Sequence, residues 1–447
     1  MTGHYNIAPL AQWASNRNIR SDQECVEVRR CLLDTLACLG IGWATPVSER
    51  AGHALESHKQ GMISTALRFG TSMHAVDFDD SEIPGSTHPS AVIFAALLPL
   101  ADQIDASMDQ LIVAYVAGFE TIAWFGRTCG YRHYEAGWHA TATTGLYGAV
   151  AACARLLELT EAELGNALSM ASSYAGGLKR QFGSDGKPLH VGMAAANALM
   201  IVPLVKAGHS ISGNVWSGPE GYMALHHAAQ QNSDFANDRL GTTSALEYEG
   251  VVRKAYPSCH YTHRLIEATS LLRSRINPLE VDRINLEMPD GYAQVVSIAE
   301  PMSGHEARFS IRFCVASCLL DGIIDLSSFG PGRLSRIEIK SLMKKISLTP
   351  YPVDNLEDLS PNAPDRIEIW MKDGTHHRHE SKLVPGSRDH PMSNADLVDK
   401  GVKCLELALN KENAERLIRL TMHDAVKVRE LTALIKLFGN KKSALPQ

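Results

Sequence analysis

No run of five or more lysines and arginines occurs in the 447 residues, and the formal net charge is −6. A nucleic-acid-binding protein needs a basic face for the phosphate backbone, so nucleic acid is not expected as a partner. No apolar stretch reaches the roughly 18 residues of a membrane span, and the N-terminus lacks the basic segment and apolar run of a signal peptide. We therefore expect a cytoplasmic protein that does not contact a membrane.

The cysteines and histidines lack the spacing of a metal centre. The nine cysteines are an odd number without a C-x-x-C pair, and most lie in apolar helical patterns, so reduced core thiols are expected. Cys314 and Cys318 are four residues apart, but no second pair accompanies them. His260 and His263 have a spacing found in zinc sites, yet neither an H-E-x-x-H motif nor a carboxylate at helical spacing goes with them. The sequence predicts no metal site.

Helix signals dominate the first part of the chain. A chain of this length exceeds the roughly 250–300 residues at which a single core usually stops growing, so two domains are expected. Three pairs fit a helix-opening capping box, namely Ser21 with Glu24, Ser107 with Gln110, and Thr160 with Glu163. Apolar residues at helical spacing follow each of them. Residues 1–255 are therefore predicted to form the first part of a helical core domain.

Residues 256–393 change to a strand-like period. Apolar residues alternate with polar ones at Ile284-Leu286-Met288, Ile337-Ile339 and Ile367-Ile369-Met371. Asp373-Gly374 predicts a type I′ hairpin. Residues 307–320 and 334–346 include helix-like stretches, and 356–364 is predicted to be a loop. This segment is predicted to be an α+β domain. Residues 394–447 return to helical composition, so we expect them to complete the helical domain, with the α+β unit as an insertion.

The most chemically dense stretch follows residue 73. It contains three carboxylates, a hydroxyl and two histidines, at His74, Asp77, Asp79, Asp80, Ser81 and His88. Acidic groups this close repel one another unless cations or hydrogen bonds compensate, which is the setting in which proton affinities are tuned for acid/base work. The alternative is that the acids only turn and cap the chain while His88 starts a helix.

Three further stretches could bind an anion or move a proton. His139 precedes a helix of small residues, where backbone N–H groups favour a negative group, although a histidine there is commonly a cap. Lys187 lies in a glycine-bearing loop before another helix, and Pro188 rules out a phosphate loop because it replaces the required Ser or Thr. Lys254 and His263 lie near the expected domain junction, where ligand clefts form.

Taken in order, these stretches resemble the signature motifs of the MmgE/PrpD family. The motifs are H-x-x-D-F-D-D from His74 followed by H-P, G-W-H ending at His139, K-P-x-H-x-G from Lys187, and K-x-Y-P-x-C from Lys254. A later A-K/R-x-S stretch begins at Ala307 and leads to L-L-D-G. The resemblance extends from about residue 25 to 440.

The resemblance implies a mainly α fold with an α+β domain: a large all-helical domain made from both chain ends plus an inserted α+β lid, usually in a homodimer. The family includes 2-methylcitrate dehydratases, cis-aconitate decarboxylases and an iminodisuccinate epimerase. It therefore implies a small-molecule polycarboxylate substrate and no metal or organic cofactor.

The resemblance also implies site residues. The catalytic set would be Asp77, His88, His139, Lys187 and Lys254, and the substrate-binding set would be Ser81, His263 and Arg308. The lysines would hold substrate carboxylates and stabilise an enediolate-like transition state. His88 or His139 would move the proton, with Asp77 orienting one of them.

One departure from the family pattern bears on the reaction. Phe313 stands where many members carry a tyrosine, and phenylalanine has no hydroxyl proton to donate. Dehydration of a 2-methylcitrate-like acid is the leading expectation. The alternatives are epimerisation or isomerisation of a dicarboxylate, decarboxylation of cis-aconitate, and a ligand-binding role that retains the fold without catalysis.

Overall fold

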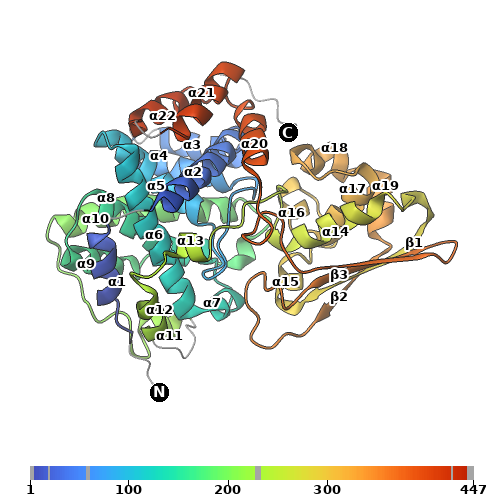
Figure 1. Ribbon diagram of the computed structural model, residues 1–447, viewed down its shortest axis with the longest axis horizontal. Helices are drawn as coiled ribbons and strands as arrows, with labels where there is room; N and C mark the ends of the chain where they lie inside the picture. The colour runs from blue at the N-terminus through green and yellow to red at the C-terminus, as the bar shows by residue number, and fades with distance from the viewer. Residues whose placement is uncertain (1–4, 19–20, 57–60, 227–232, 424–425, 440–447) are drawn as a thin grey trace.

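The computed structural model describes residues 5–18, 21–56, 61–226, 233–423 and 426–439. It is mainly helical, with a four-stranded mixed sheet in the C-terminal region (Figure 1). The helices of the first half gather on one side of the molecule, and the sheet with its covering helices lies on the other. The predicted helical region and α+β region are both present.

Six long helices build the larger part: α2 (Asp22–Gly42), α4 (Met62–His74), α5 (Pro89–Gln103), α6 (Met108–Cys129), α8 (Ala140–Leu156) and α10 (Gly186–Lys206). Shorter ones surround them: α1 (Ala8–Asn16), α3 (Pro46–Glu56), α7 (Tyr131–Glu135), α9 (Glu161–Ala171), η1 (Lys179–Gln181), α11 (Tyr222–Leu225), α12 (Asp234–Arg239) and α13 (Ala245–Tyr248). All three predicted capping boxes are confirmed at the starts of α2, α6 and α9, where each cap side chain accepts a backbone N–H.

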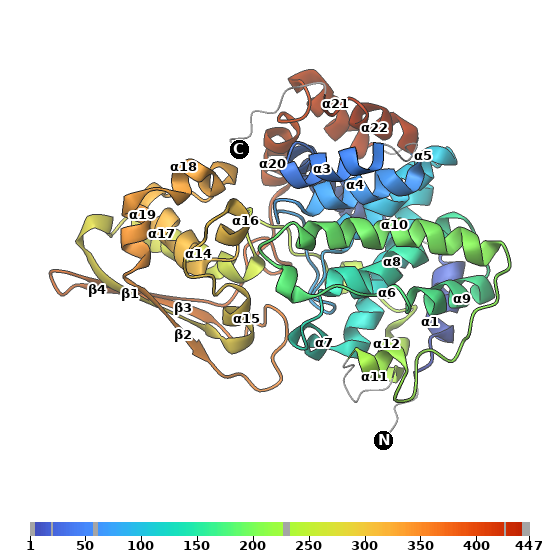
Figure 2. The same cartoon turned by 180° about the vertical axis from the view of Figure 1, so that it is seen from behind.

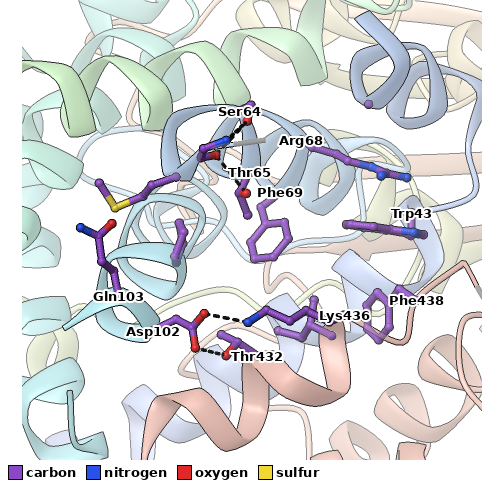
Figure 3. A pocket seen from close by; sticks show the side chains of 15 residues that line it. Trp43, Ser64, Thr65, Arg68, Phe69, Asp102, Gln103, Thr432, Lys436 and Phe438 are labelled. Atoms are coloured by element: carbon purple, nitrogen blue, oxygen red, sulfur yellow. Dashed lines mark hydrogen bonds and ion pairs between the residues drawn. The ribbon is translucent and has the colours of Figure 1, made fainter. Parts of the chain in front are cut away.

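The end of the chain returns to these helices. It forms α20 (Asn394–Leu405), α21 (Lys411–Thr421) and α22 (Val428–Ile435); α20 packs on α2, and α22 packs on α5. In Figure 3, Lys436 and Thr432 both bind the Asp102 carboxylate beside a cavity of about 610 Å³. None of the eight predicted site residues lines this cavity. The predicted boundaries at residues 255 and 393 stay a prediction.

The α+β part comprises η2 (His260–Thr262), α14 (His263–Arg273), η3 (Pro278–Glu280), β1 (Val281–Pro289), α15 (Asp290–Val295), α16 (Gly304–Ala307), α17 (Ile311–Asp321), η4 (Leu326–Phe329), α18 (Pro331–Leu334), α19 (Ile337–Met343), β2 (Ile346–Tyr351), β3 (Asp365–Met371) and β4 (His376–Ser381). The strand order is β2-β1-β3-β4, with β1 parallel to β2 and antiparallel to β3. Helix α14 packs on β3 and β4, and α17 packs on α14. The strands predicted around Leu286 and Ile369 are confirmed.

Two local predictions were wrong. Ile337-Ile339 is not a strand but part of helix α19, which agrees with the helix-like stretch at 334–346. Ile339, Leu342 and Met343 make a buried stripe at helical spacing, while Ile337 is 80% exposed. The hairpin at Asp373-Gly374 is not type I′, since only the glycine has a positive φ, of 88°. Its three-residue loop is closed by Met371, whose N–H donates to the Thr375 carbonyl oxygen.

Among the described residues, α10 is the single helix that is long and apolar enough to cross a membrane by itself. Helices α2 and α3 together meet the same criterion as a bent pair. Of the apolar stretch in α10, 61% is buried inside the protein. It packs on α4, α8, α5 and α9, and Figure 2 shows it lying across α8 beside α4. Packing within the helical core accounts for its apolar composition.

Helices α4 and α10 cross at two glycines. A Cβ atom on Gly192 would lie 2.2 Å from the Leu67 carbonyl oxygen, and one on Gly70 would lie 2.8 Å from the Gly192 Cα. The backbones can touch only because neither residue has a side chain. Because α4 leads into the loop of Asp77 and α10 begins beside Lys187, this contact sets the distance between those two residues.

We expect Gly192→Ala to lower the free energy of unfolding by about 3 kcal/mol, because a rigid helix backbone cannot yield to the added methyl group. It should lower activity further than stability explains, since Lys187 moves with α10. Gly165→Ala in α9 is the control: a Cβ there meets nothing within 4 Å, so stability should rise by about 0.5–1 kcal/mol. Urea unfolding followed by circular dichroism measures both, and equal stability of the two variants would contradict the expectation.

Candidate active site

Six of the eight predicted site residues line one cavity between the helical part and the α+β part: Asp77, Ser81, His88, His139, Lys187 and Lys254. Its volume is about 40 Å³, which is room for one or a few water molecules. Three of these residues stand at helix starts: His88 is at the N-cap position of α5, His139 is at that of α8, and Lys187 is in the first turn of α10. The positive ends of these helices make this region favourable for a negatively charged ligand.

The centre of the cavity is a buried ion-pair cluster. One oxygen of Asp77, Oδ1, lies 2.7 Å from the Lys187 Nζ and 2.8 Å from the Lys254 Nζ. Lys254 also donates to the Asp77 carbonyl oxygen at 2.9 Å. Burial alone would raise the pKa of Asp77, but the two ammonium groups outweigh it and hold that pKa well below 3.8. Two cations share one anion, so the cluster carries a net positive charge.

His88 is built to act as a base. Its Nδ1 lies 2.8 Å from the Asp80 carbonyl oxygen, which can only accept, so Nδ1 carries the hydrogen and Nε2 keeps its lone pair. The Nε2 atom lies 3.9 Å from the Asp77 Oδ1. Burial lowers the pKa of His88 well below 6.5, against the opposing charge of Asp79. The imidazole is therefore neutral near pH 7.

A second layer holds His88 from behind. The His74 Nδ1 lies 2.8 Å from the Asp79 Oδ2, and the rings of His74 and His88 are 4.5 Å apart. Asp80 faces the other way, where it accepts from the Ser90 hydroxyl at 2.5 Å, so the capping alternative describes this residue correctly. The sequence suggested acid/base work for the whole stretch, but the side chains divide between the cavity and its support.

His139 is the second neutral histidine on the wall. Its Nδ1 lies 3.1 Å from the Nδ1 of His190, and its Nε2 is buried without a hydrogen bond to the described residues. Burial lowers the pKa of His139 well below 6.5, and nearby His74 and Lys187 lower it further. The geometry makes both His88 and His139 able to accept a proton, so the choice between them stays open.

His263 and Arg308 do not line this cavity. The buried ring of His263 lies behind His260, at 4.7 Å between ring centres, and its Nε2 donates to the Ser258 carbonyl oxygen at 3.2 Å. Arg308 lines a different cavity, of about 550 Å³, and lies 4.8 Å from the Phe329 ring. His260 instead reaches the cavity, and its Nδ1 lies 2.6 Å from the Ser81 hydroxyl oxygen. Substrate contacts from His263 and Arg308 stay a prediction.

Phe313 also lies away from the cavity. It is buried in the core of the α+β part, with its ring 5.9 Å from that of Phe329. Its backbone N–H donates a hydrogen bond to the side chain of Ser310, the N-cap residue of α17. An acid on this cavity wall therefore has to come from another residue.

Several wall residues were missed by the sequence reading: Ser86, Thr87, Tyr134, Thr141, Phe182, Cys259, Tyr261, Phe309, Asp358 and Leu359. The backbone is strained at some positions of this wall. Three wall residues that are not glycine have positive φ values: Asp77 (54°), Ser86 (52°) and Leu359 (49°). Such conformations cost about 1 kcal/mol or more each and collect at functional sites. Sequence patterns do not display them.

A larger cavity adjoins the small one. It measures about 640 Å³ and shares Phe182 and Phe309, whose ring centres are 5.5 Å apart. Lys179 and Arg180 line it, and burial lowers the pKa of Lys179 to about 8. A polycarboxylate is larger than the inner cavity, so its binding requires this aromatic pair or the α+β part to move.

Four wall and support residues could also hold a metal ion by geometry. Ligand atoms of His74, Asp77, Asp79 and His88 lie within 4.8 Å of one another. However, Asp77 is already bound by two ammonium groups, and Asp79 is bound by His74. A cation here would be repelled by both lysines, so the charges favour an anionic ligand instead.

We expect Asp77→Asn to lower the free energy of unfolding by about 3–5 kcal/mol near pH 7, because it leaves two ammonium groups buried and unpaired. The folded-state pKa of Asp77 is depressed, so its contribution is complete above the unfolded value of 3.8 and is lost as pH falls through the folded value. The difference between variant and parent should thus be the same at pH 7 and pH 5.

Urea unfolding at both pH values measures this difference. Asp399→Asn is the control, since Asp399 forms an exposed pair with Lys403, and it should cost less than about 0.5 kcal/mol. A similarly small loss for Asp77→Asn would contradict the buried ion-pair cluster.

Comparison with known proteins covers both parts of the chain. Residues 8–234 match the model of the MmgE/PrpD N-terminal domain, and residues 256–424 match that of the MmgE/PrpD C-terminal domain. The cis-aconitate decarboxylase of Homo sapiens is 26% identical over 446 residues, which covers 93% of this chain and 91% of that protein. The mouse enzyme of the same name is 26% identical, covering 91% and 88%. The cis-aconitate decarboxylase of Aspergillus terreus strain NIH 2624 is 24% identical, covering 97% and 95%.

Proposed function

Because the chain belongs to the MmgE/PrpD family, we propose that it is a carboxy-lyase acting on an unsaturated tricarboxylate of the cis-aconitate type. From the sequence motifs alone, dehydration is the leading expectation. The relatives favour the decarboxylation alternative, because proteins named cis-aconitate decarboxylases align over nearly the whole chain. Homodimer assembly and a cytoplasmic location stay predictions.

The ion-pair cluster at Asp77 is the observation that supports a substrate with several carboxylates. Lys187 and Lys254 are buried, lie within 2.8 Å of one carboxylate oxygen, and leave a net positive charge beside three helix starts. A substrate carboxylate can replace part of the charge that Asp77 supplies to these lysines. A ligand with several carboxylates therefore gains more here than a neutral one.

The same charges suit the electron flow of decarboxylation. The bond to one carboxylate carbon breaks, carbon dioxide leaves, and the electron pair passes into the carbon skeleton next to a remaining carboxylate. The resulting enediolate-like charge lies on oxygens that Lys187 and Lys254 can hold, with Ser81 as a further donor. A proton must then be added to carbon, so that the tricarboxylate and one proton give a dicarboxylate and carbon dioxide.

We expect the purified protein to release carbon dioxide from cis-aconitate and to produce new CH₂= proton signals in the NMR spectrum. The panel includes citrate and 2-methylcitrate in deuterated water. Formation of an unsaturated acid from citrate without gas release would identify a hydro-lyase, and deuterium exchange without either would identify an epimerase or isomerase. Either outcome would overturn decarboxylation as the main activity.

We expect Lys187→Met and Lys254→Met each to lower kcat/KM by about 10²–10³-fold, because each removes a charge that stabilises the developing anion. Lys206→Met is the matched control for the first, since Lys206 is exposed at the far end of the same helix α10. Steady-state kinetics with cis-aconitate as the substrate measures the effect. If all three variants retained parent kcat/KM, the lysines would have no part in catalysis.

A further inference from the structure

One loop of the α+β part has six buried residues among its ten, although it forms no helix or strand. It comprises residues 355–364, and we call it the 355–364 loop. The Arg264 side chain, 1% exposed, donates to the carbonyl oxygens of Ala363 and Ser360, both at 3.0 Å, and to that of Leu359. Tyr292 fixes the same loop by accepting from the Ser360 N–H at 3.0 Å. This loop is therefore fixed in place like a structural element.

The fixed loop places a carboxyl group on the cavity wall. Asp358 and Leu359 both line the cavity that holds Asp77, His88 and the two lysines. Asp358 is 8% exposed, and its side chain accepts from the Tyr261 hydroxyl at 2.6 Å and from the Ser86 hydroxyl. Tyr261 belongs to the α+β part and Ser86 to the helical part. Asp358 thus lies where the two parts meet over the cavity.

The surroundings of Asp358 adjust its proton affinity. Burial raises its pKa to about 6, while the hydrogen bonds from Tyr261 and Ser86 and the charge of Arg264 oppose the rise. Asp358 also interacts electrostatically with Lys179 and Glu82. A bound polycarboxylate would bring further negative charge next to Asp358 and raise its pKa again. The charge of a bound polycarboxylate therefore favours the protonated form of Asp358.

The proposed decarboxylation needs a proton donor, and the two ammonium groups on the wall are already paired with Asp77. His88 and His139 are both neutral, because burial lowers their pKa values well below 6.5, and a neutral imidazole is a poor proton donor. Phe313 is outside the cavity and has no acidic proton. Asp358 is the carboxyl group on the wall that no lysine binds within hydrogen-bonding distance among the described residues.

We propose that Asp358 is a catalytic acid that delivers the proton to carbon after carbon dioxide has left. This inference rests on the proposed function. The O–H bond of the protonated carboxyl breaks, a C–H bond forms with the electron pair left by decarboxylation, and Asp358 becomes a carboxylate. The hydroxyls of Tyr261 and Tyr131, 3.1 Å apart, lie behind it and stabilise that carboxylate until it takes up a proton again.

Asp358→Asn tests the proposal because asparagine keeps an oxygen that can accept from Tyr261 but has no acidic proton. We expect kcat to fall by about 100-fold or more with little change in KM. Glu357→Gln is the matched control on the same loop, since Glu357 is exposed and only its backbone oxygen binds Tyr292; it should retain parent activity.

The pH profile separates an acid from a residue that only holds the loop. An acid must be protonated to act, so the parent kcat should fall as pH rises through the pKa of Asp358 in the complex, and Asp358→Asn should lack that fall. Tyr261→Phe removes a hydrogen bond that favours the carboxylate, so it should move the fall to higher pH. Parent-like kcat in Asp358→Asn, or a raised KM with an unchanged profile, would overturn the proposal.

A second readout does not depend on turnover. Calorimetry of citrate binding near pH 7, in buffers of different ionisation enthalpy, counts the protons taken up on binding. We expect the parent to take up more than Asp358→Asn does, whereas equal uptake would overturn the assignment of Asp358. A parent that binds citrate with this uptake but releases no carbon dioxide from cis-aconitate would refute the proposed function and leave Asp358 as the group that protonates.

Discussion

The structure depends most on the buried carboxylate of Asp77 and the two ammonium groups that share it. The three residues come from separate segments: the loop after α4, the start of α10, and the strand-like segment that leads into the α+β part. Burying three charges is unfavourable unless they compensate one another, and two cations with one anion compensate only in part. The remaining positive charge makes the site electrostatically favourable for an anion.

The rest of the fold keeps this cluster in place. Helices α4 and α10 come into backbone contact at Gly70 and Gly192, which have no side chains. The left-handed backbone of Asp77 turns its side chain toward both lysines. The C-terminal helix α20 adds a third support: Lys400 donates to the carbonyl oxygen of Phe78 at 2.8 Å and pairs with Asp34 of α2 at 2.7 Å. The end of the chain therefore acts on the site directly, which gives a physical reason for its return to the helical part.

Sequence patterns predicted what depends on local chemistry or on an ordered motif set. The capping boxes and the strands around Leu286 and Ile369 follow from side-chain spacing, and six site residues follow from motifs that share a cavity. The patterns failed where tertiary packing decides. Ile337 and Ile339 alternate as in a strand, yet only Ile339 packs. The sequence around Asp358 is that of a polar loop. It does not show that Arg264, more than 90 positions earlier, holds this loop by hydrogen bonds to its backbone.

Dehydration, epimerisation and decarboxylation all require charge to collect next to a carboxylate, so the lysines alone do not select among them. The selection depends on which proton sources face that charge. Neutral His88 and His139 on the helical wall suit proton removal, whereas decarboxylation starts without it and needs a proton only at the end. Asp358, whose carboxyl group is held by hydroxyls from both parts of the chain, is the group proposed to meet that need. With Asp358 as the proposed donor, the cavity combines two neutral histidines with one acid, and this combination separates the proposed decarboxylation from dehydration and epimerisation.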